Sequence, residues 1–138
     1  MDGIQGAILN VKLRYLPEWI EKRRKAASHY DDLLKDIGNV VTPYCPTEIR
    51  HVYHLYVVQT KKRDDLKKYL GDCGIATGIH YPIALPNLQA YRHLGYKPKD
   101  FPIASKYQDK ILSFPMYPEL GEEQIRFLAD KVVEFLDQ

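Results

Sequence analysis

The sequence of 138 residues has the length of one ordinary domain, long enough to bury a single hydrophobic core. Twenty Lys and Arg face eighteen Asp and Glu, so a net charge of +2 excludes a strong general attraction to nucleic acid or to anionic membranes. The two cysteines, Cys45 and Cys73, form neither a CxxC pair nor a disulfide framework, and neither a long apolar run nor a signal-peptide pattern is present. We therefore expect one soluble unit in a reducing cytoplasm.

The first 38 residues are predicted to form a long helix, because apolar residues recur at helical spacing on both sides of Pro17. Proline lacks an amide donor and is best tolerated in a first turn, so Pro17 predicts one kinked helix or two helices in line. We expect Gly38 to end the segment as a left-handed cap. Such a helix is out of proportion for a small domain, so residues 1–38 are predicted to connect the domain at residues 39–138 to other structure.

Four basic residues in a row, 22–25, lie on this predicted helix. One interpretation is a patch that binds nucleic acid, and the other is an ordinary solvated helix face. Glu18 and Glu21 lie close by and offset the positive charge, so we favour the solvated face.

After residue 39 the pattern alternates short strands with short helices. Strands are predicted at residues 40–44, 51–60 and 75–80, with a brief extended segment at 114–117. Helices are predicted at residues 64–73, 87–94, 102–112 and 122–136. Gly74 is expected to end the first of these helices and Asp100 to cap the third. The buried face of the last helix is predicted to carry Ile125, Leu128, Val132, Val133 and Leu136. These elements predict an α+β fold, with a mostly antiparallel sheet covered by helices.

The usual signs of a metal site or an activated nucleophile are missing from the pattern. His51 and His54 are three residues apart in a predicted strand, which sends them to opposite faces, so no metal site is predicted. Neither cysteine lies in a context that lowers a thiol pKa. The lysines lie on polar faces or in charged loops, whereas a Schiff-base lysine needs a desolvated pocket. We therefore assign no catalytic residue.

The segment 78–86, Gly-Ile-His-Tyr-Pro-Ile-Ala-Leu-Pro, is the one stretch suited to a ligand. A strand that ends in His80 and Tyr81 places two hydrogen-bonding side chains at the margin of a sheet, and Pro82 stiffens the exit. On spacing alone a structural histidine is the simpler interpretation, because one histidine is weak evidence for a site.

A series of short motifs runs through the whole chain in a fixed order. They are DGIQGAIL at 2–9, Arg23-Arg24, HLYVV at 54–58, GIATGIHYP at 74–82, QAYRHLGY at 89–96, LSFPMYP at 112–118 and EEQI at 122–125. In this order they resemble the C-terminal third of the DegT/DnrJ/EryC1/StrS family, the pyridoxal-phosphate-dependent sugar aminotransferases. The family commonly has a histidine soon after His-Tyr-Pro, where this chain has Leu85-Pro86-Asn87.

The resemblance implies an aspartate-aminotransferase-type fold (fold type I) in a longer parent protein, of which this chain would be the small C-terminal domain and the connecting helix. It also implies the reaction, in which pyridoxal phosphate takes an amino group from a donor such as glutamate and passes it to a keto group on a nucleotide-linked sugar. By the same resemblance, His80 and Tyr81 lie on the substrate side of the pocket and are the expected substrate-binding residues.

The family's cofactor-binding lysine, ring aspartate and phosphate-binding asparagine all lie before the position of Met1. We therefore assign no cofactor-binding residue to this chain and expect it to be inactive alone, with no cofactor bound covalently. The expected partners are the missing large domain and a second subunit of a homodimer, with no nucleic acid and no membrane. The alternative is a stand-alone binding or regulatory module derived from the same domain.

Overall fold

The computed structural model describes residues 2–137, so Met1 and Gln138, the outermost residues of the two predicted units, lie outside the described residues. The chain starts with two helices, α1 (Gly3–Leu13) and α2 (Leu16–Leu34). The side chain of Asp2 caps α1 by accepting a hydrogen bond from the amide of Gln5 over 2.9 Å. Pro17 lies in the first turn of α2, where its missing amide removes no helical hydrogen bond. The break between the helices therefore precedes Pro17.

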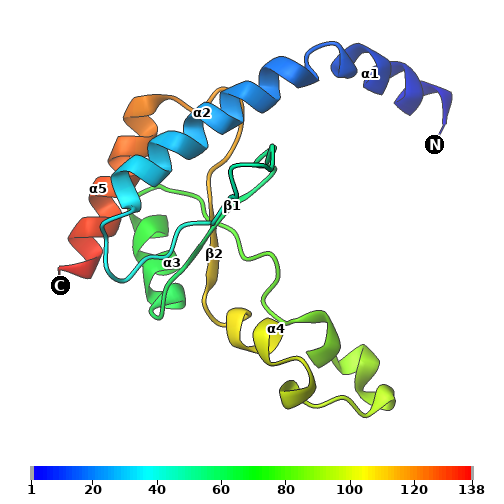
Figure 1. Ribbon diagram of the computed structural model, residues 1–138, viewed down its shortest axis with the longest axis vertical. Helices are drawn as coiled ribbons and strands as arrows, with labels where there is room; N and C mark the ends of the chain where they lie inside the picture. The colour runs from blue at the N-terminus through cyan, green and yellow to red at the C-terminus, as the bar shows by residue number, and fades with distance from the viewer. Residues whose placement is uncertain (1, 138) are drawn as a thin grey trace.

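Helix α1 contributes nothing to the core, because none of its residues is buried. It projects away from the rest of the molecule toward the N-terminus, as Figure 1 shows. Its large apolar side chains are exposed, namely those of Ile4, Ile8, Leu9, Val11 and Leu13. The packed part of the chain therefore begins with α2.

The predicted left-handed cap at Gly38 is wrong. Helix α2 ends at Leu34, and the described glycines with a positive φ are Gly74 and Gly95. The chain leaves α2 through tight turns instead, in which the amides of Ile37 and Val40 donate to the carbonyls of Leu34 and Ile37. The first of these turns satisfies the carbonyl of Leu34, the last residue of α2, without a left-handed residue.

The core lies between α2, α3 (Arg63–Asp72), α5 (Glu122–Leu136) and a two-stranded sheet. Figure 1 shows α2 and α5 side by side with the strands beneath them, and contacts link α5 to both α2 and α3. The fully buried large side chains are Tyr30, Leu34, Tyr56, Val58, Leu66, Leu70, Leu112, Ile125, Leu128 and Val132. Helix α5 has the predicted bounds, but Val133 is exposed and the half-buried Leu136 only flanks the core, because the buried stripe follows Ile125, Leu128, Ala129 and Val132.

The sheet pairs β1 (Tyr56–Gln59) antiparallel with β2 (Ile111–Phe114), in a register that sets Tyr56 opposite Phe114 and Gln59 opposite Ile111. Single bridges extend it on both sides, from Val41 to Gln59 and from Gly78 to Ser113. The predicted α+β class with an antiparallel sheet is confirmed, although each strand is only four residues long.

The predicted strands at residues 40–44 and 75–80 are wrong as continuous strands, since each makes only one bridge. Pro43 has no amide to donate to a ladder, which limits the pairing around Val41. The predicted strand at residues 51–60 begins only at Tyr56. Before it, Tyr53 has a φ of 47° and its amide donates to Nδ1 of His51 over 2.9 Å, so a side chain takes the place of a strand partner.

Gly74 ends α3 as predicted, with a φ of 80°. The amide of Ile75 donates to the carbonyl of Leu70 over 2.8 Å and that of Gly74 to Gly71 over 3.0 Å, the two hydrogen bonds of a Schellman motif. Leu70 and Ile75 are both buried, so this turn also delivers the chain from α3 toward residue 78 at the sheet edge.

Replacing Gly74 with alanine is expected to destabilise the chain by about 1–2 kcal/mol, because an L side chain is strained in the left-handed region. No atom lies within 4 Å of a Cβ built there, so the cost is one of backbone conformation and not of space. Gly71 is the matched control, since it is helical and equally uncrowded, and Gly71→Ala is expected to stabilise by about 0.5–1 kcal/mol. Urea unfolding of both variants measures the difference, and equal effects of the two substitutions would contradict it.

Residues 79–110 form a separate projection below the sheet in Figure 1. It contains three short 3-10 helices, at Leu85–Asn87, Gln89–Leu94 and Pro98–Asp100, and helix α4 (Pro102–Tyr107). The helix predicted at 102–112 is therefore too long and the extended segment predicted at 114–117 begins too late, because residues 111–114 pair with β1. Asp100 does not cap α4 but accepts a hydrogen bond from the amide of Lys97 over 2.8 Å.

Candidate functional site

His80 lies where the chain leaves the edge of the sheet. Two residues earlier, Gly78 pairs with Ser113 of β2 through two backbone hydrogen bonds of 2.7 and 3.0 Å. The Nδ1 atom of His80 lies 2.9 Å from Oγ of Ser113, and the His80 side chain is otherwise exposed. The Nδ1 edge of the ring is thereby anchored on the sheet, while the other ring nitrogen, Nε2, remains for a ligand.

The His80 ring lies against the backbone of Gly78. A Cβ built on Gly78 would stand 2.7 Å from Cε1 and 3.4 Å from Nδ1 of that ring. A Cβ atom essentially never lies closer than 3.0 Å to a heavy atom that is not bonded nearby. A side chain at position 78 would therefore push the His80 ring away from Ser113. The observed placement of His80 therefore needs glycine at position 78.

Tyr81 follows His80 through a cis peptide bond, with its ring 5.9 Å from the imidazole in an edge-on arrangement. Its side chain is 73% exposed and forms one wall of an apolar hollow of about 350 Å³. The lining residues are Tyr81, Pro82, Ile83, Leu85 and Leu88. The structure thus brings the two predicted site residues together, with His80 anchored and Tyr81 facing open space.

A polar clamp holds the loop after Tyr81 against the end of α4. Oε1 of Gln108 accepts hydrogen bonds from the amide of Ala84 over 2.9 Å and from Nδ2 of Asn87 over 3.0 Å. Asn87 Nδ2 also lies 3.0 Å from Oγ of Ser105. These bonds fix the loop that carries the apolar hollow.

A second hollow of about 650 Å³ lies elsewhere, between α2, α5 and the segment after β2. Tyr30, Ile75, Tyr117 and Phe127 are among its lining residues, and neither His80 nor Tyr81 is. Burial raises the pKa of Tyr30 well above its ordinary value, so this phenol stays neutral. The larger hollow therefore offers apolar surface but lacks the paired histidine and tyrosine.

Among residues 2–137, no group of three or more His, Cys, Asp or Glu side chains is arranged to hold a metal ion. His51 and His54 do not lie on opposite faces of a strand as predicted, because the strand begins after them. Cys45 and Cys73 are both free thiols. None of the helices in the described part of the chain has the length and apolarity needed to cross a membrane.

Three of the four basic residues at 22–25, Lys22, Arg24 and Lys25, are paired with acidic side chains. Nζ of Lys22 lies 2.7 Å from Glu18, and Nζ of Lys25 lies 3.1 Å from Glu122 of α5. The hydrogen bond from Lys25 holds the pKa of Glu122 below its ordinary value. This pattern of neighbouring opposite charges is that of a solvated helix face.

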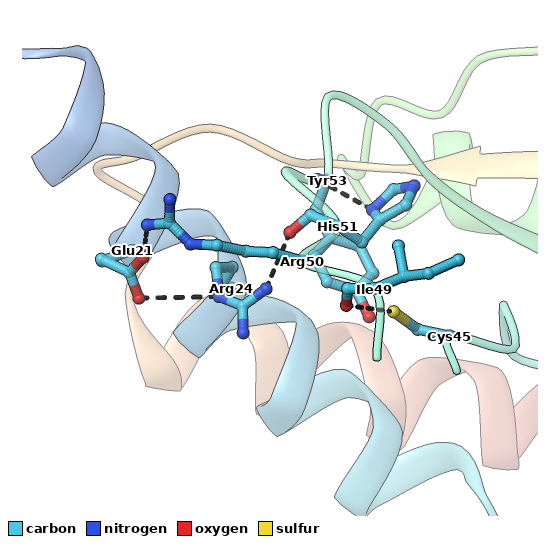
Figure 2. A network of polar contacts seen from close by, with 7 residues as sticks. All are labelled: Glu21, Arg24, Cys45, Ile49, Arg50, His51 and Tyr53. Atoms are coloured by element: carbon cyan, nitrogen blue, oxygen red, sulfur yellow. Dashed lines mark hydrogen bonds and ion pairs between the residues drawn. The ribbon is translucent and has the colours of Figure 1, made fainter. Parts of the chain in front are cut away.

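Arg24 has a structural contact of its own. Figure 2 shows its guanidinium between Glu21 and the loop at residues 49–53, where Nη1 donates to the carbonyl of His51 over 3.0 Å. Arg50 reaches back from the same loop to pair with Glu21. The network ties the loop before β1 to α2. Arg24 and Arg50 therefore both interact with other residues of this chain.

The sequence pattern singles out His80 and Tyr81 but misses the residues that hold them. Ser113 interrupts the apolar run of β2, and a lone polar residue at a buried strand position was the available signal. Gln108 gives no such signal, because it falls inside the helix predicted at residues 102–112 and its role depends on the loop that folds against it.

The similarity to known proteins extends along nearly the whole chain. The model of the DegT/DnrJ/EryC1/StrS aminotransferase family matches residues 1–133. A "Pleiotropic regulatory protein" of Geobacillus stearothermophilus is 42% identical over 137 residues, which cover 98% of this chain and 37% of that protein. The dTDP-3-amino-3,6-dideoxy-alpha-D-galactopyranose transaminase of Aneurinibacillus thermoaerophilus is 32% identical, over 96% of this chain and 36% of that enzyme.

Among solved structures, DesV of S. venezuelae in complex with a ketimine intermediate has a TM-score of 0.93 and 28% identity, covering 100% of this chain and 37% of DesV. The chain therefore spans a little more than a third of the length of the proteins that it matches. With its motifs in order, its fold shared throughout and the family model matched from residue 1 to residue 133, the chain belongs to the DegT/DnrJ/EryC1/StrS aminotransferase family.

Proposed function

We propose that this chain is the C-terminal part of an aminotransferase that moves an amino group from a donor such as glutamate to a keto group on a nucleotide-linked sugar. The single observation that carries the proposal is the match to the aminotransferase family over residues 1–133. The substrate class rests on relatives whose names specify sugar-nucleotide transaminases. The matched share of about 36% of those relatives supports a longer parent protein.

The residues of this chain do not fit pyridoxal phosphate, the cofactor we propose for the parent. A lysine becomes a nucleophile when burial lowers its pKa, yet none of the lysines among residues 2–137 is buried. Lys131, one of the less exposed, lies 2.6 Å from Glu134, and that hydrogen bond raises its pKa instead. We therefore propose that the parent's large domain holds the cofactor and that the isolated chain is inactive.

In this proposal, His80 and Tyr81 form part of the substrate side of the pocket. His80 offers Nε2 and Tyr81 a phenolic hydroxyl, both able to hydrogen-bond the oxygen atoms of a sugar nucleotide. The anchoring of His80 on Ser113 and the clamp at Gln108 support this role, because binding side chains act best from a rigid frame.

The rest of the chain has a place in the same proposal. Residues 1–38 would connect the small domain at 39–138 to the large one, whose surface would cover the exposed apolar side chains of α1. The parent would be a homodimer, as the family resemblance implies. Its compartment would be a reducing cytoplasm, in keeping with the free thiols of Cys45 and Cys73.

Borohydride reduction in the presence of pyridoxal phosphate tests whether the isolated chain binds the cofactor. We expect weak labelling spread over many lysines, equal for the folded chain and for the chain unfolded in urea, when peptides are analysed by mass spectrometry. The unfolded chain is the matched control, because it has the same lysines without any pocket. A single lysine labelled stoichiometrically in the folded chain alone would overturn the proposal that the cofactor site lies outside it.

The second candidate function is a stand-alone binding or regulatory module. It is favoured by one observation, the regulatory name of the 42%-identical relative from Geobacillus stearothermophilus. Coding sequence that continues upstream into a lysine-bearing large domain would support the aminotransferase, whereas a native start at Met1 would support the module.

A further inference from the structure

Ser113 is a polar residue in an otherwise apolar strand. Its neighbours in β2, Leu112 and Phe114, are buried in the core, and Ser113 points to the opposite face because side chains alternate along a strand. Only 3% of Ser113 is exposed. A buried hydroxyl is unfavourable unless it is hydrogen-bonded, and its partner here is Nδ1 of His80 at 2.9 Å.

The direction of this hydrogen bond follows from the requirement that the buried hydroxyl hydrogen of Ser113 has an acceptor. If Nδ1 of His80 donated, the buried hydroxyl hydrogen would require a second acceptor, and the hydrogen bonds among residues 2–137 give Oγ of Ser113 no other partner. An unpaired buried donor is costly, whereas an unused lone pair on a hydroxyl oxygen costs less. Ser113 therefore donates to Nδ1, which leaves the proton of the neutral imidazole on Nε2.

Gly78 leaves room for the same arrangement. Its backbone pairs with that of Ser113, so the strand pairing fixes the distance between the two residues. The ring of His80 occupies the space that a Cβ at position 78 would need, at 2.7 Å from Cε1. Hydroxyl and glycine together hold the ring in one orientation.

We propose that Ser113 and Gly78 are positioning residues that fix His80 as the Nε2–H tautomer, so that it serves as a hydrogen-bond donor to an oxygen atom of the substrate. That the recipient is a nucleotide-linked sugar rests on the proposed function. The tautomer and its cause rest on the contacts of this chain alone. Phosphate, hydroxyl and keto oxygens of such a substrate are all acceptors, which a fixed N–H donor suits.

Long-range ¹H–¹⁵N NMR of the ¹⁵N-labelled 138-residue chain tests the proposal, because protonated and unprotonated ring nitrogens differ widely in chemical shift. At about pH 8, where an ordinary histidine is neutral, His80 is expected to give the pattern of a single Nε2–H tautomer. His51 is an internal reference, since its Nδ1 accepts a hydrogen bond from the amide of Tyr53 and must lack a proton. Detection of His80 with the proton on Nδ1 would overturn the proposal.

The variants separate positioning from general stability. Ser113→Ala is expected to shift both ring nitrogens of His80 toward a mixture of tautomers while the signals of His51 stay in place, and Ser113→Thr is expected to retain the original pattern. Gly78→Ala is expected to give the same mixture of His80 tautomers, although Ser113 is still present. A His80 pattern that stays unchanged in both Ser113→Ala and Gly78→Ala would sink the proposal, and if Ser113→Ala fails to fold, Gly78→Ala decides alone.

A double-substitution cycle checks the contact between Gly78 and His80. Gly78→Ala is expected to lower the Tm when His80 is present and to have a clearly smaller effect in a His80→Ala background, because the crowded ring is then absent. Equal effects in both backgrounds would contradict the contact. None of these measurements uses a sugar or a cofactor, so they succeed or fail independently of the aminotransferase proposal.

Discussion

Replacing Tyr30 with alanine is expected to lower the free energy of unfolding by about 3–5 kcal/mol, the usual cost of truncating a fully buried aromatic residue. Tyr30 is 0% exposed, and its ring lies 4.7 Å from that of Tyr56 and 6.0 Å from that of Phe114, measured between centroids. It joins α2 to both strands of the sheet. Because domains are stable by only about 5–15 kcal/mol, the loss is a large share of the total.

The hydroxyl of Tyr30 makes a separate contribution, which the variant Tyr30→Phe isolates. It donates a hydrogen bond to the carbonyl of Pro115 over 3.1 Å, next to the end of β2. Tyr30→Phe keeps the ring contacts and is expected to cost about 1–2 kcal/mol. Urea unfolding followed by circular dichroism compares both variants with the wild type. A Tyr30→Ala protein within about 1 kcal/mol of the wild type would show that this aromatic cluster does not hold the fold together.

Replacing Arg63 with methionine is expected to cost about 2–4 kcal/mol and to loosen the loop that follows Tyr81. Arg63 is only 7% exposed, and its Nη1 donates to the carbonyls of Gln108 and Ile111 over 3.2 and 3.4 Å. Methionine keeps an apolar stem of similar length but leaves both carbonyls without that donor. The turn that carries Gln108 then loses its support, and with it the clamp on Ala84.

Hydrogen exchange read by NMR follows the second effect. The amide of Ala84, which donates to Gln108, is expected to exchange about tenfold faster or more in Arg63→Met, since about 1.4 kcal/mol corresponds to a factor of ten. The matched control is Asp65→Asn. Asp65 is an exposed carboxylate in the same first turn of α3 and none of the ion pairs among residues 2–137 includes it, so its removal is expected to cost less than about 1 kcal/mol. If the amide of Ala84 exchanged in Arg63→Met at the same rate as in the wild type, the link between the buried arginine and the loop would be contradicted.

The parts of the fold that the sequence predicted well are those determined by local pattern. Helix α5 follows an unbroken apolar stripe, and α3 ends where Gly74 supplies the left-handed residue. The short strands were predicted less well, because their extent depends on partners far along the chain. Residues 111 and 112 have the pattern of a helix end, yet pairing with β1 makes them part of a strand, and tertiary contacts of this kind override helix propensity.

In the candidate site, too, the residues of a local motif could be predicted, whereas their distant partners could not. The motif at residues 78–82 is enough to single out His80 and Tyr81, whereas the partners Ser113 and Gln108 lie 33 and 24 positions away from the groups that they bind. Sequence spacing alone cannot bring such residues together, because a hydrogen bond between them exists only after the sheet and the loop have formed.

The pairing of β2 with both of its neighbours has a consequence for how this protein can vary. Side chains along a strand alternate between faces, so a shift of β2 by a single residue would turn Ser113 toward the interior and present Leu112 or Phe114 to the imidazole. Neither leucine nor phenylalanine has a hydroxyl that could donate a hydrogen bond to Nδ1 of His80. Insertions or deletions within residues 111–114 would therefore erase the chemistry at residue 80 even where the chain still folded, while length changes in the exposed turn at residues 95–97 would leave it intact.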